Sequence, residues 1–317
     1  MEAATTPATA PRAPSPEGGD WLRMLGGVAF AVGAVALFIR KSGATSSSDW
    51  ADFPLLLVAA IPCGLLFGVG VSGRQVGEIP RWRAVLMVTG VLLAPLALEQ
   101  LRETLGLSET ANFWHFLIFA LVVAMAAYAS FIVGAAYQAL LAALAGIVAW
   151  VYFWEWILDN PGINAFRWLL IILGLGYLGA ALALRADNAP QGNELITAAG
   201  IVGVIVGVLG VSSAATEAVS PFGVTGGGEG QGFFWDLILL VVSLASVAYG
   251  AVTHARGPAY VGFFGLVFFV LLVGLEANEL LKGERPDGAF VGWPLALLLI
   301  GGGALAAGVA AQRQTGR

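Results

Sequence analysis

Long apolar segments separated by short polar or glycine-containing stretches make up most of this chain. The hydrocarbon core of a bilayer is about 30 Å thick and needs roughly 20 apolar residues per helix. Ten segments meet this requirement and predict an all-α integral membrane protein with ten transmembrane helices. The predicted spans are Trp21–Ile39, Phe53–Val71, Ala84–Leu98, Phe113–Ser130, Tyr137–Trp156, Ala165–Leu184, Glu194–Ser213, Phe233–Val252, Tyr260–Leu275 and Val291–Ala311.

The boundary between the fourth and fifth spans has the weakest signal. No charged residue occurs between Glu109 and Glu155. A single helix over residues 113–158 would be about 69 Å long at 1.5 Å per residue, which is far too long for one crossing. We therefore expect the chain to turn at Ser130–Ala136.

The distribution of basic residues predicts the orientation, because cytoplasmic loops carry an excess of lysine and arginine. With ten spans, both termini share one side of the membrane with alternate loops. That side has nine basic residues, against six on the other, so we expect cytoplasmic termini. Residues 1–20, rich in proline, alanine and threonine, are expected to form a disordered cytoplasmic tail. A transmembrane domain over residues 21–311 and a short cytoplasmic tail over 312–317 would follow.

Tryptophan and glutamate recur at the predicted outer ends of the spans. Even-numbered spans begin near a tryptophan, and odd-numbered spans from the third to the ninth end near a glutamate. The tryptophans are Trp50, Trp114, Trp168, Trp235 and Trp293, and the glutamates are Glu99, Glu155, Glu217 and Glu276. One interpretation is five tandem parallel helical hairpins; the other is an aromatic belt at the membrane interface.

Composition and charge exclude several classes of function. Of the 317 residues, 58% are hydrophobic and 11% are charged, compared with about 25% charged in soluble domains. The net charge of −5 gives nucleic acid no basic surface to bind. One cysteine and two histidines leave little material for a metal site. We identify no pair of nucleophile and base, so we expect no catalytic residues, cofactor or metal.

Glycines are spaced for close helix packing in two of the predicted spans. Gly200, Gly203, Gly207 and Gly210 follow one face of the seventh span, and Gly64 and Gly68 form a small-xxx-small pair in the second. Such faces allow helix backbones to approach closely in lipid. These glycines are therefore candidate packing residues, within one chain or between chains. The expected partners are the bilayer and either other membrane subunits or a second copy.

Ionisable residues near the hydrocarbon are the candidate functional residues, because their burial is costly and requires a partner. Glu155 is the first candidate because it lies among aromatic residues with no basic residue within ten positions. Glu276, Glu217 and Glu99 occupy comparable positions, and Asp236 and His115 lie at the same predicted level. If Glu155 faces the protein interior, it should be neutral or bound to a cation. If it faces headgroup water, its replacement should have no effect.

The last third of the chain resembles uncharacterised bacterial multi-span membrane proteins of unknown function. The resembling segments are Gly232-Phe-Phe-Trp235, Tyr249-Gly250, Arg256-Gly-Pro-Ala-Tyr-Val-Gly262 and Gly292-Trp-Pro294. The resemblance implies a bacterial origin and a plasma-membrane location, and it brings no activity with it.

Two functional interpretations follow. The first is a membrane protein without catalytic machinery that serves as a scaffold, accessory subunit or sensor. The second is a secondary transporter of a small solute, cation or proton that uses Glu155 and Glu276. The scarcity of polar side chains at mid-membrane depth favours the first, because ion-coupled carriers normally place carboxylates or broken helices there. An intramembrane enzyme acting on lipid is a third and weaker interpretation.

Overall fold

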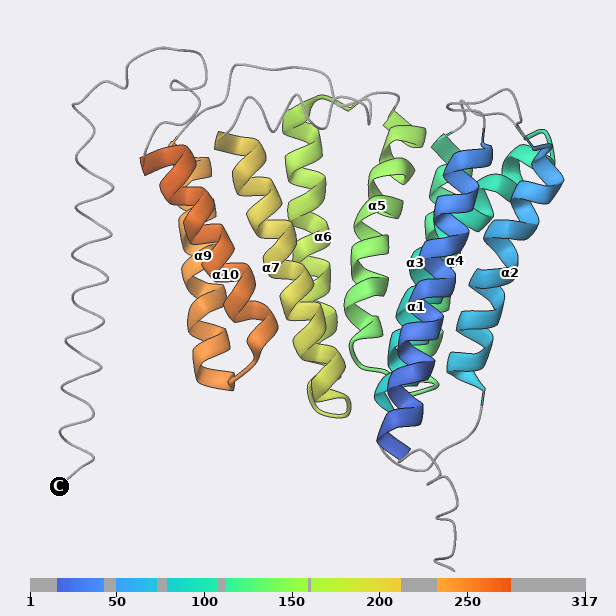
Figure 1. Ribbon diagram of the computed structural model, residues 1–317. Helices are drawn as coiled ribbons and strands as arrows, with labels where there is room; N and C mark the ends of the chain where they lie inside the picture. The colour runs from blue at the N-terminus through green and yellow to red at the C-terminus, as the bar shows by residue number, and fades with distance from the viewer. Residues whose placement is uncertain are drawn as a thin grey trace, which may run out of the picture. The chain divides into compact units, whose positions relative to one another are not determined.

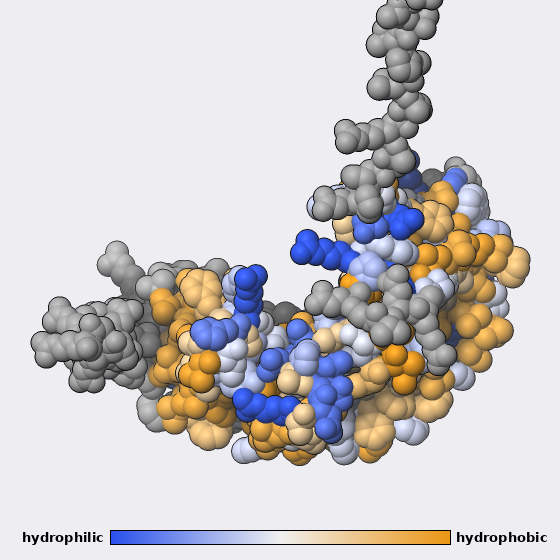
Figure 2. Space-filling model, turned by 90° about the horizontal axis from the view of Figure 1, so that it is seen from below, coloured by the Kyte–Doolittle hydropathy of each residue, from blue (hydrophilic) through white to orange (hydrophobic). Residues whose placement is uncertain are grey.

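The computed structural model describes residues 16–42, 50–72, 79–107, 112–158, 161–211 and 233–274. Within these ranges, nine helices are long and apolar enough to cross a membrane (Figure 1). In a view along the helices, hydrophilic residues gather at helix ends and hydrophobic residues cover the helix sides (Figure 2). The chain is therefore a multi-pass helical membrane protein, as the sequence predicts. The predicted tenth span, Val291–Ala311, lies outside the described residues.

The chain divides into two compact units, Met1–Trp156 and Ile157–Arg317. In the described part of the first unit, successive helices run in opposite directions (Figure 1). These helices are α1 (Pro16–Lys41), α2 (Asp52–Val71), α3 (Arg81–Thr104), α4 (Asn112–Phe131) and α5 (Gln138–Leu158). The predicted turn between the fourth and fifth spans is confirmed, because the chain is not helical between Phe131 and Gln138. Gly134 has a φ of +88° in this turn, a conformation that glycine adopts without strain.

The second unit is also built of antiparallel helices where it is described (Figure 1). They are α6 (Ile163–Leu184), α7 (Ala189–Val211), α9 (Phe233–Thr253) and α10 (Arg256–Phe269). A π-helical turn, Val270–Gly274, continues α10. The ninth predicted span, Tyr260–Leu275, thus begins four residues earlier than expected, directly after the turn at His254.

Close backbone contact in the first unit occurs between α2 and α3. A Cβ atom on Gly90 would lie 2.7 Å from the backbone nitrogen of Phe67, and one on Gly70 would lie 3.0 Å from that of Met87. The candidate packing residues Gly64 and Gly68 have no atom within 4 Å of such a position. The contact between α2 and α3 therefore depends on Gly70 and Gly90 rather than on the small-xxx-small pair.

In the second unit the glycine face of α7 lies directly against α9. A Cβ atom would come within 2.6 Å of Val242 if added at Gly203, and within 2.6 Å of Leu239 if added at Gly207. A Cβ atom added at Gly210 would overlap Trp235, and one added at Gly200 would lie 3.0 Å from the Ser246 hydroxyl oxygen. All four glycines of this face therefore contact α9 of the same chain.

Candidate functional site

Glu155 lies in the last turn of α5 and is buried. Only 4% of the residue is exposed, although it belongs to the most polar residue types. Its Oε1 atom has no hydrogen-bond partner among the described residues. The sequence left open whether Glu155 faces the protein interior or headgroup water, and the structure shows that it faces the interior. Burial of a carboxyl group without full hydrogen bonding is costly, so Glu155 is a candidate functional residue.

Aromatic rings separate α4 from α5 around this carboxyl group. Phe113 lies 5.1 Å from Trp156 between ring centroids, and Phe116 lies 5.3 Å from Phe153. These side chains hold the two helix backbones apart, so the interface has room for polar groups. Glu155 therefore sits at the end of an interface that is built from rings rather than from close backbone contact.

His115 and Tyr152 continue this interface as a stacked pair. Their rings are 4.9 Å apart with an interplanar angle of 22°. Tyr152 is also within electrostatic range of Glu155 and of Glu99 on α3. The Nδ1 atom of His115 has no hydrogen-bond partner among the described residues. His115 thus lies close to Glu99, and Tyr152 is within electrostatic range of both Glu99 and Glu155.

An ion pair on α3 completes the group. Arg102 is 5% exposed and donates hydrogen bonds to Glu99 Oε1 from Nε at 3.0 Å and from Nη2 at 2.5 Å. A third bond, from Nη1 to the Leu107 carbonyl at 2.9 Å, holds the guanidinium at the end of its helix. The Nε2 atom of His115 lies 3.8 Å from the same Glu99 oxygen. Arg102 therefore compensates the charge of Glu99, whereas no basic side chain in the described part of the chain forms an ion pair with Glu155.

We call Glu99, Arg102, His115, Tyr152 and Glu155 the Glu155 cluster. It contains one carboxylate paired with an arginine, one buried carboxyl group whose Oε1 has no hydrogen-bond partner among the described residues, and an imidazole 3.8 Å from the paired carboxylate. Such groups can hold and exchange a proton, since imidazole and carboxyl side chains are the usual proton carriers inside membrane proteins. In the described part of the chain, no three His, Cys, Asp or Glu side chains are placed to hold a metal ion.

Sequence reasoning identified part of this cluster. Glu155, Glu99 and His115 were candidates, and the structure brings them to one end of the first unit. Arg102 and Tyr152 were missed; an arginine just beyond an apolar segment, three residues after a glutamate, was the available signal for the ion pair. Glu217 and Glu276 lie outside the described residues, and Asp236 lies on α9 of the second unit.

The tryptophans expected at one interface occupy equivalent helix ends within each unit. In the first unit, Trp50 precedes α2 and Trp114 is in the first turn of α4, at the end where α5 also finishes (Figure 1). In the second unit, the Trp168 and Trp235 rings are 6.4 Å apart. Trp293 lies outside the described residues.

Buried arginines cap helix ends in both units, which the sequence analysis did not anticipate. Arg83 on α3 donates hydrogen bonds to the carbonyl oxygens of Gly70 at 2.9 Å and Val71 at 3.0 Å, at the end of α2. Arg167 on α6 bonds to the Leu209 carbonyl near the end of α7 and lies 5.0 Å from the Trp235 ring. Carbonyl groups in the last turn of a helix have no intrahelical partner, and each arginine donates to a carbonyl oxygen near the end of a neighbouring helix.

Comparison of the chain with protein-family models, curated proteins and solved structures found no match.

Proposed function

We propose that this chain is a proton-responsive protein of the bacterial plasma membrane that acts as a sensor or accessory subunit rather than as an enzyme. The observation that carries the proposal is the burial of Glu155 within electrostatic range of Tyr152, with its Oε1 atom unpaired among the described residues. An unpaired charge at this position would be costly, so a change of proton occupancy alters the energy of the interface between α4 and α5.

The other ionisable side chains of α3, α4 and α5 at this end of the first unit are Glu99, Arg102, Glu103, His115 and Tyr152. Arg102 pairs with Glu99 and lies 3.9 Å from Glu103 on α3, and His115 on α4 lies 3.8 Å from Glu99. Tyr152 on α5 is within electrostatic range of both Glu99 and Glu155. When Glu155 loses its proton, the cluster gains a negative charge that Arg102 does not compensate directly. Because the aromatic side chains link α4 to α5, we expect the change in the charge of Glu155 to shift these two helices relative to each other.

The packing of the first unit supports sensing over transport. The core around the middle of α3 is apolar and includes Leu93, Ala94 and Val122. The buried polar side chains of Arg83, Ser130 and Gln138 lie at the other end of these helices. The hydroxyl of Thr89, in the middle of α3, donates to the Val85 carbonyl of its own helix at 2.8 Å. These groups offer no polar route for an ion from the cluster along α3. The alternative, a secondary transporter using Glu155 and Glu276, predicts flux across the membrane.

Infrared difference spectroscopy tests the proposal directly. The full chain, reconstituted in lipid, is stepped between about pH 4 and about pH 9, a range that spans ordinary carboxyl and imidazole titration. We expect a carbonyl-stretch band from a buried protonated carboxyl group, and we expect Glu155→Gln to remove it. Asp52→Asn is the matched control, because Asp52 is an exposed carboxylate in the first turn of α2.

Two outcomes would contradict the proposal. An identical band in the wild type and Glu155→Gln would remove Glu155 from the site. Proton flux into liposomes, measured with an enclosed pH-sensitive dye and lost in Glu155→Gln, would favour the transporter instead.

A further inference from the structure

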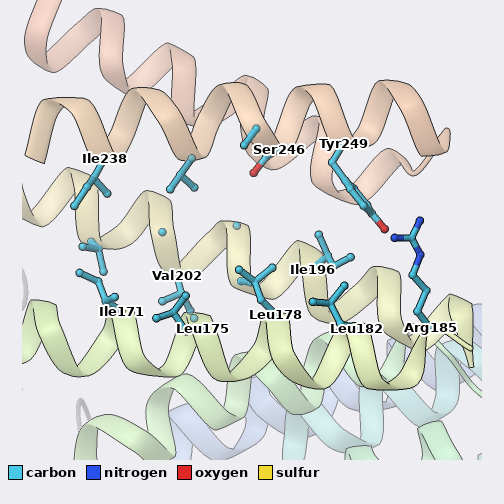
Figure 3. Close-up of a pocket in the computed structure, with 17 residues that line it drawn as sticks. Ile171, Leu175, Leu178, Leu182, Arg185, Ile196, Val202, Ile238, Ser246 and Tyr249 are labelled. Atoms are coloured by element: carbon cyan, nitrogen blue, oxygen red, sulfur yellow. The ribbon is translucent and has the colours of Figure 1, made fainter.

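A long cavity lies between α6, α7 and α9 of the second unit, remote in sequence from the Glu155 cluster. Its volume is about 540 Å³, within the range of about 300–1,000 Å³ typical of ligand sites. Fourteen of its seventeen lining residues are glycine, alanine, valine, leucine or isoleucine. Figure 3 shows α7 between the other two helices, with Leu178 and Leu182 of α6 and Ile238 of α9 along its walls.

Small residues of α7 and α6 form part of the wall of this cavity. Ala199, Gly200 and Gly203 line it from α7, and Gly174 lines it from α6. The walls include strongly exposed side chains, since Leu175 is 62% and Leu182 is 64% exposed. In a membrane such side chains face lipid, so the cavity is open to the surrounding acyl chains.

One end of the cavity is polar, because Arg185 and Tyr249 point toward each other there (Figure 3). The Arg185 guanidinium carbon is 6.0 Å from the centre of the Tyr249 ring. The Tyr249 hydroxyl donates to Asn193 Oδ1 at 2.9 Å, which directs its proton away from the cavity and leaves its oxygen as an acceptor. Arg185 therefore provides the donors at this end.

The charge of Arg185 is not compensated by an ion pair within the described residues. Asp187 and Glu194 are the nearest acidic residues along the chain, and neither pairs with it. Arg185 is exposed directly after the end of α6, where a lipid headgroup would be located. An exposed cation at the end of an apolar cavity is complementary to an amphiphile with an anionic headgroup.

We infer that this cavity binds an anionic phospholipid, with one acyl chain along α7 and the phosphate at Arg185. Along α6 the lining extends from Ile171 to Arg185, about 21 Å at 1.5 Å per residue. One leaflet of hydrocarbon is about 15 Å thick, so the cavity is long enough for an acyl chain. Basic pockets between transmembrane helices are a known mode of binding anionic headgroups.

A cavity in the first unit provides an internal contrast. It has a volume of about 470 Å³ between α1 and α2, and its lining includes Phe30, Leu57 and Pro62. All of its lining residues are apolar, so it offers no group that would distinguish one headgroup from another. We therefore assign the headgroup preference to the second unit.

Native mass spectrometry of the full chain tests this inference. Phosphatidylglycerol and phosphatidylcholine with identical acyl chains are supplied in equal amounts, and the first retained lipid is identified. We expect phosphatidylglycerol to be favoured about five-fold, which corresponds to the roughly 1 kcal/mol expected for one basic residue at a membrane surface. Arg185→Gln should reduce the ratio to about one, and Arg185→Lys should retain most of it.

Two matched controls separate charge from shape. Arg256→Gln removes an exposed arginine at the start of α10, outside the cavity lining, and should keep the preference. Ala245→Phe fills the cavity from α9 and should reduce retention of both lipids, whereas Ala180→Phe, on α6 outside the lining, should not. Circular dichroism confirms that each variant is folded.

Three results would overturn the inference. The first is equal retention of the two lipids by the wild type. The second is a preference that survives Arg185→Gln, and the third is unchanged retention in Ala245→Phe. The absence of any retained lipid counts as the first of these results.

Discussion

The interface between α4 and α5 and the interface between α7 and α9 use opposite ways of packing helices. Between α7 and α9, glycines bring backbones together, and a Cβ atom on Gly207 would lie 2.9 Å from the Cα atom of Leu239. Between α4 and α5, rings fill the interface, with Phe116 and Phe153 centred 5.3 Å apart. The first arrangement excludes large polar side chains, and the second accommodates them.

Buried side-chain atoms without a hydrogen-bond partner among the described residues occur in both units, including Arg167 Nε in the second, and two of them lie in the aromatic interface. The hydroxyl of Ser243 on α9, which lies next to Gly265 of α10, donates to the Leu239 carbonyl of its own helix at 2.6 Å. In the aromatic interface, Glu155 Oε1 and His115 Nδ1 have no partner among the described residues. Close packing thus favours stability in the second unit, whereas the ring-filled interface of the first unit retains groups that can change protonation.

The largest expected effect is on the glycine interface. Gly207→Leu should destabilise the protein by about 3 kcal/mol or more, because the new side chain would overlap Leu239. Gly176→Leu is the control, since a Cβ atom there meets nothing within 4 Å. Denaturant unfolding in detergent micelles measures both. Equal losses in the two variants would show that the close contact between α7 and α9 does not determine stability.

Loss of the hydrogen bonds made by Arg167 should have the next largest effect. Arg167→Met should cost about 2 kcal/mol, because it removes hydrogen bonds to the Leu209 carbonyl and to Asn164 Oδ1, the latter at 3.0 Å. Arg256→Met, at an exposed position, should change stability by no more than about 0.5 kcal/mol. The same unfolding assay compares them, and an unchanged stability in Arg167→Met would mean that the cap on α7 is dispensable.

The smallest effect should have the opposite sign. Glu155→Leu should stabilise the protein by about 1 kcal/mol relative to Glu155→Gln, because leucine removes a buried polar group that has an unpaired oxygen. Glutamine keeps the shape and the unsatisfied polarity. Unfolding of the two variants at one pH gives this difference. A less stable leucine variant would indicate that Glu155 is bonded to a group that compensates its burial.

The helices could be predicted well, whereas the Glu155 cluster could be predicted only in part. Apolar length alone determined the nine described spans, because bilayer thickness sets a minimum that any spanning helix must satisfy. The end of α3 extended to Thr104, beyond the predicted Leu98, because Glu99 and Arg102 satisfy each other and allow the helix to continue. Hydropathy along the sequence does not reveal such ion pairs, so it places the end of the helix too early.

The sequence by itself established a helical membrane protein, the turn before α5 and an unusual carboxyl group at Glu155, because hydrophobic length and local charge are properties of neighbouring residues. Only the tertiary structure decided that Glu155 is buried, that His115 stacks on Tyr152, and that Arg185 meets Tyr249 at the end of an apolar cavity. Each of these depends on which faces of different helices meet. In lipid, where apolar faces lack a hydrophobic drive to associate, that choice is made by side-chain shape and hydrogen bonding across interfaces.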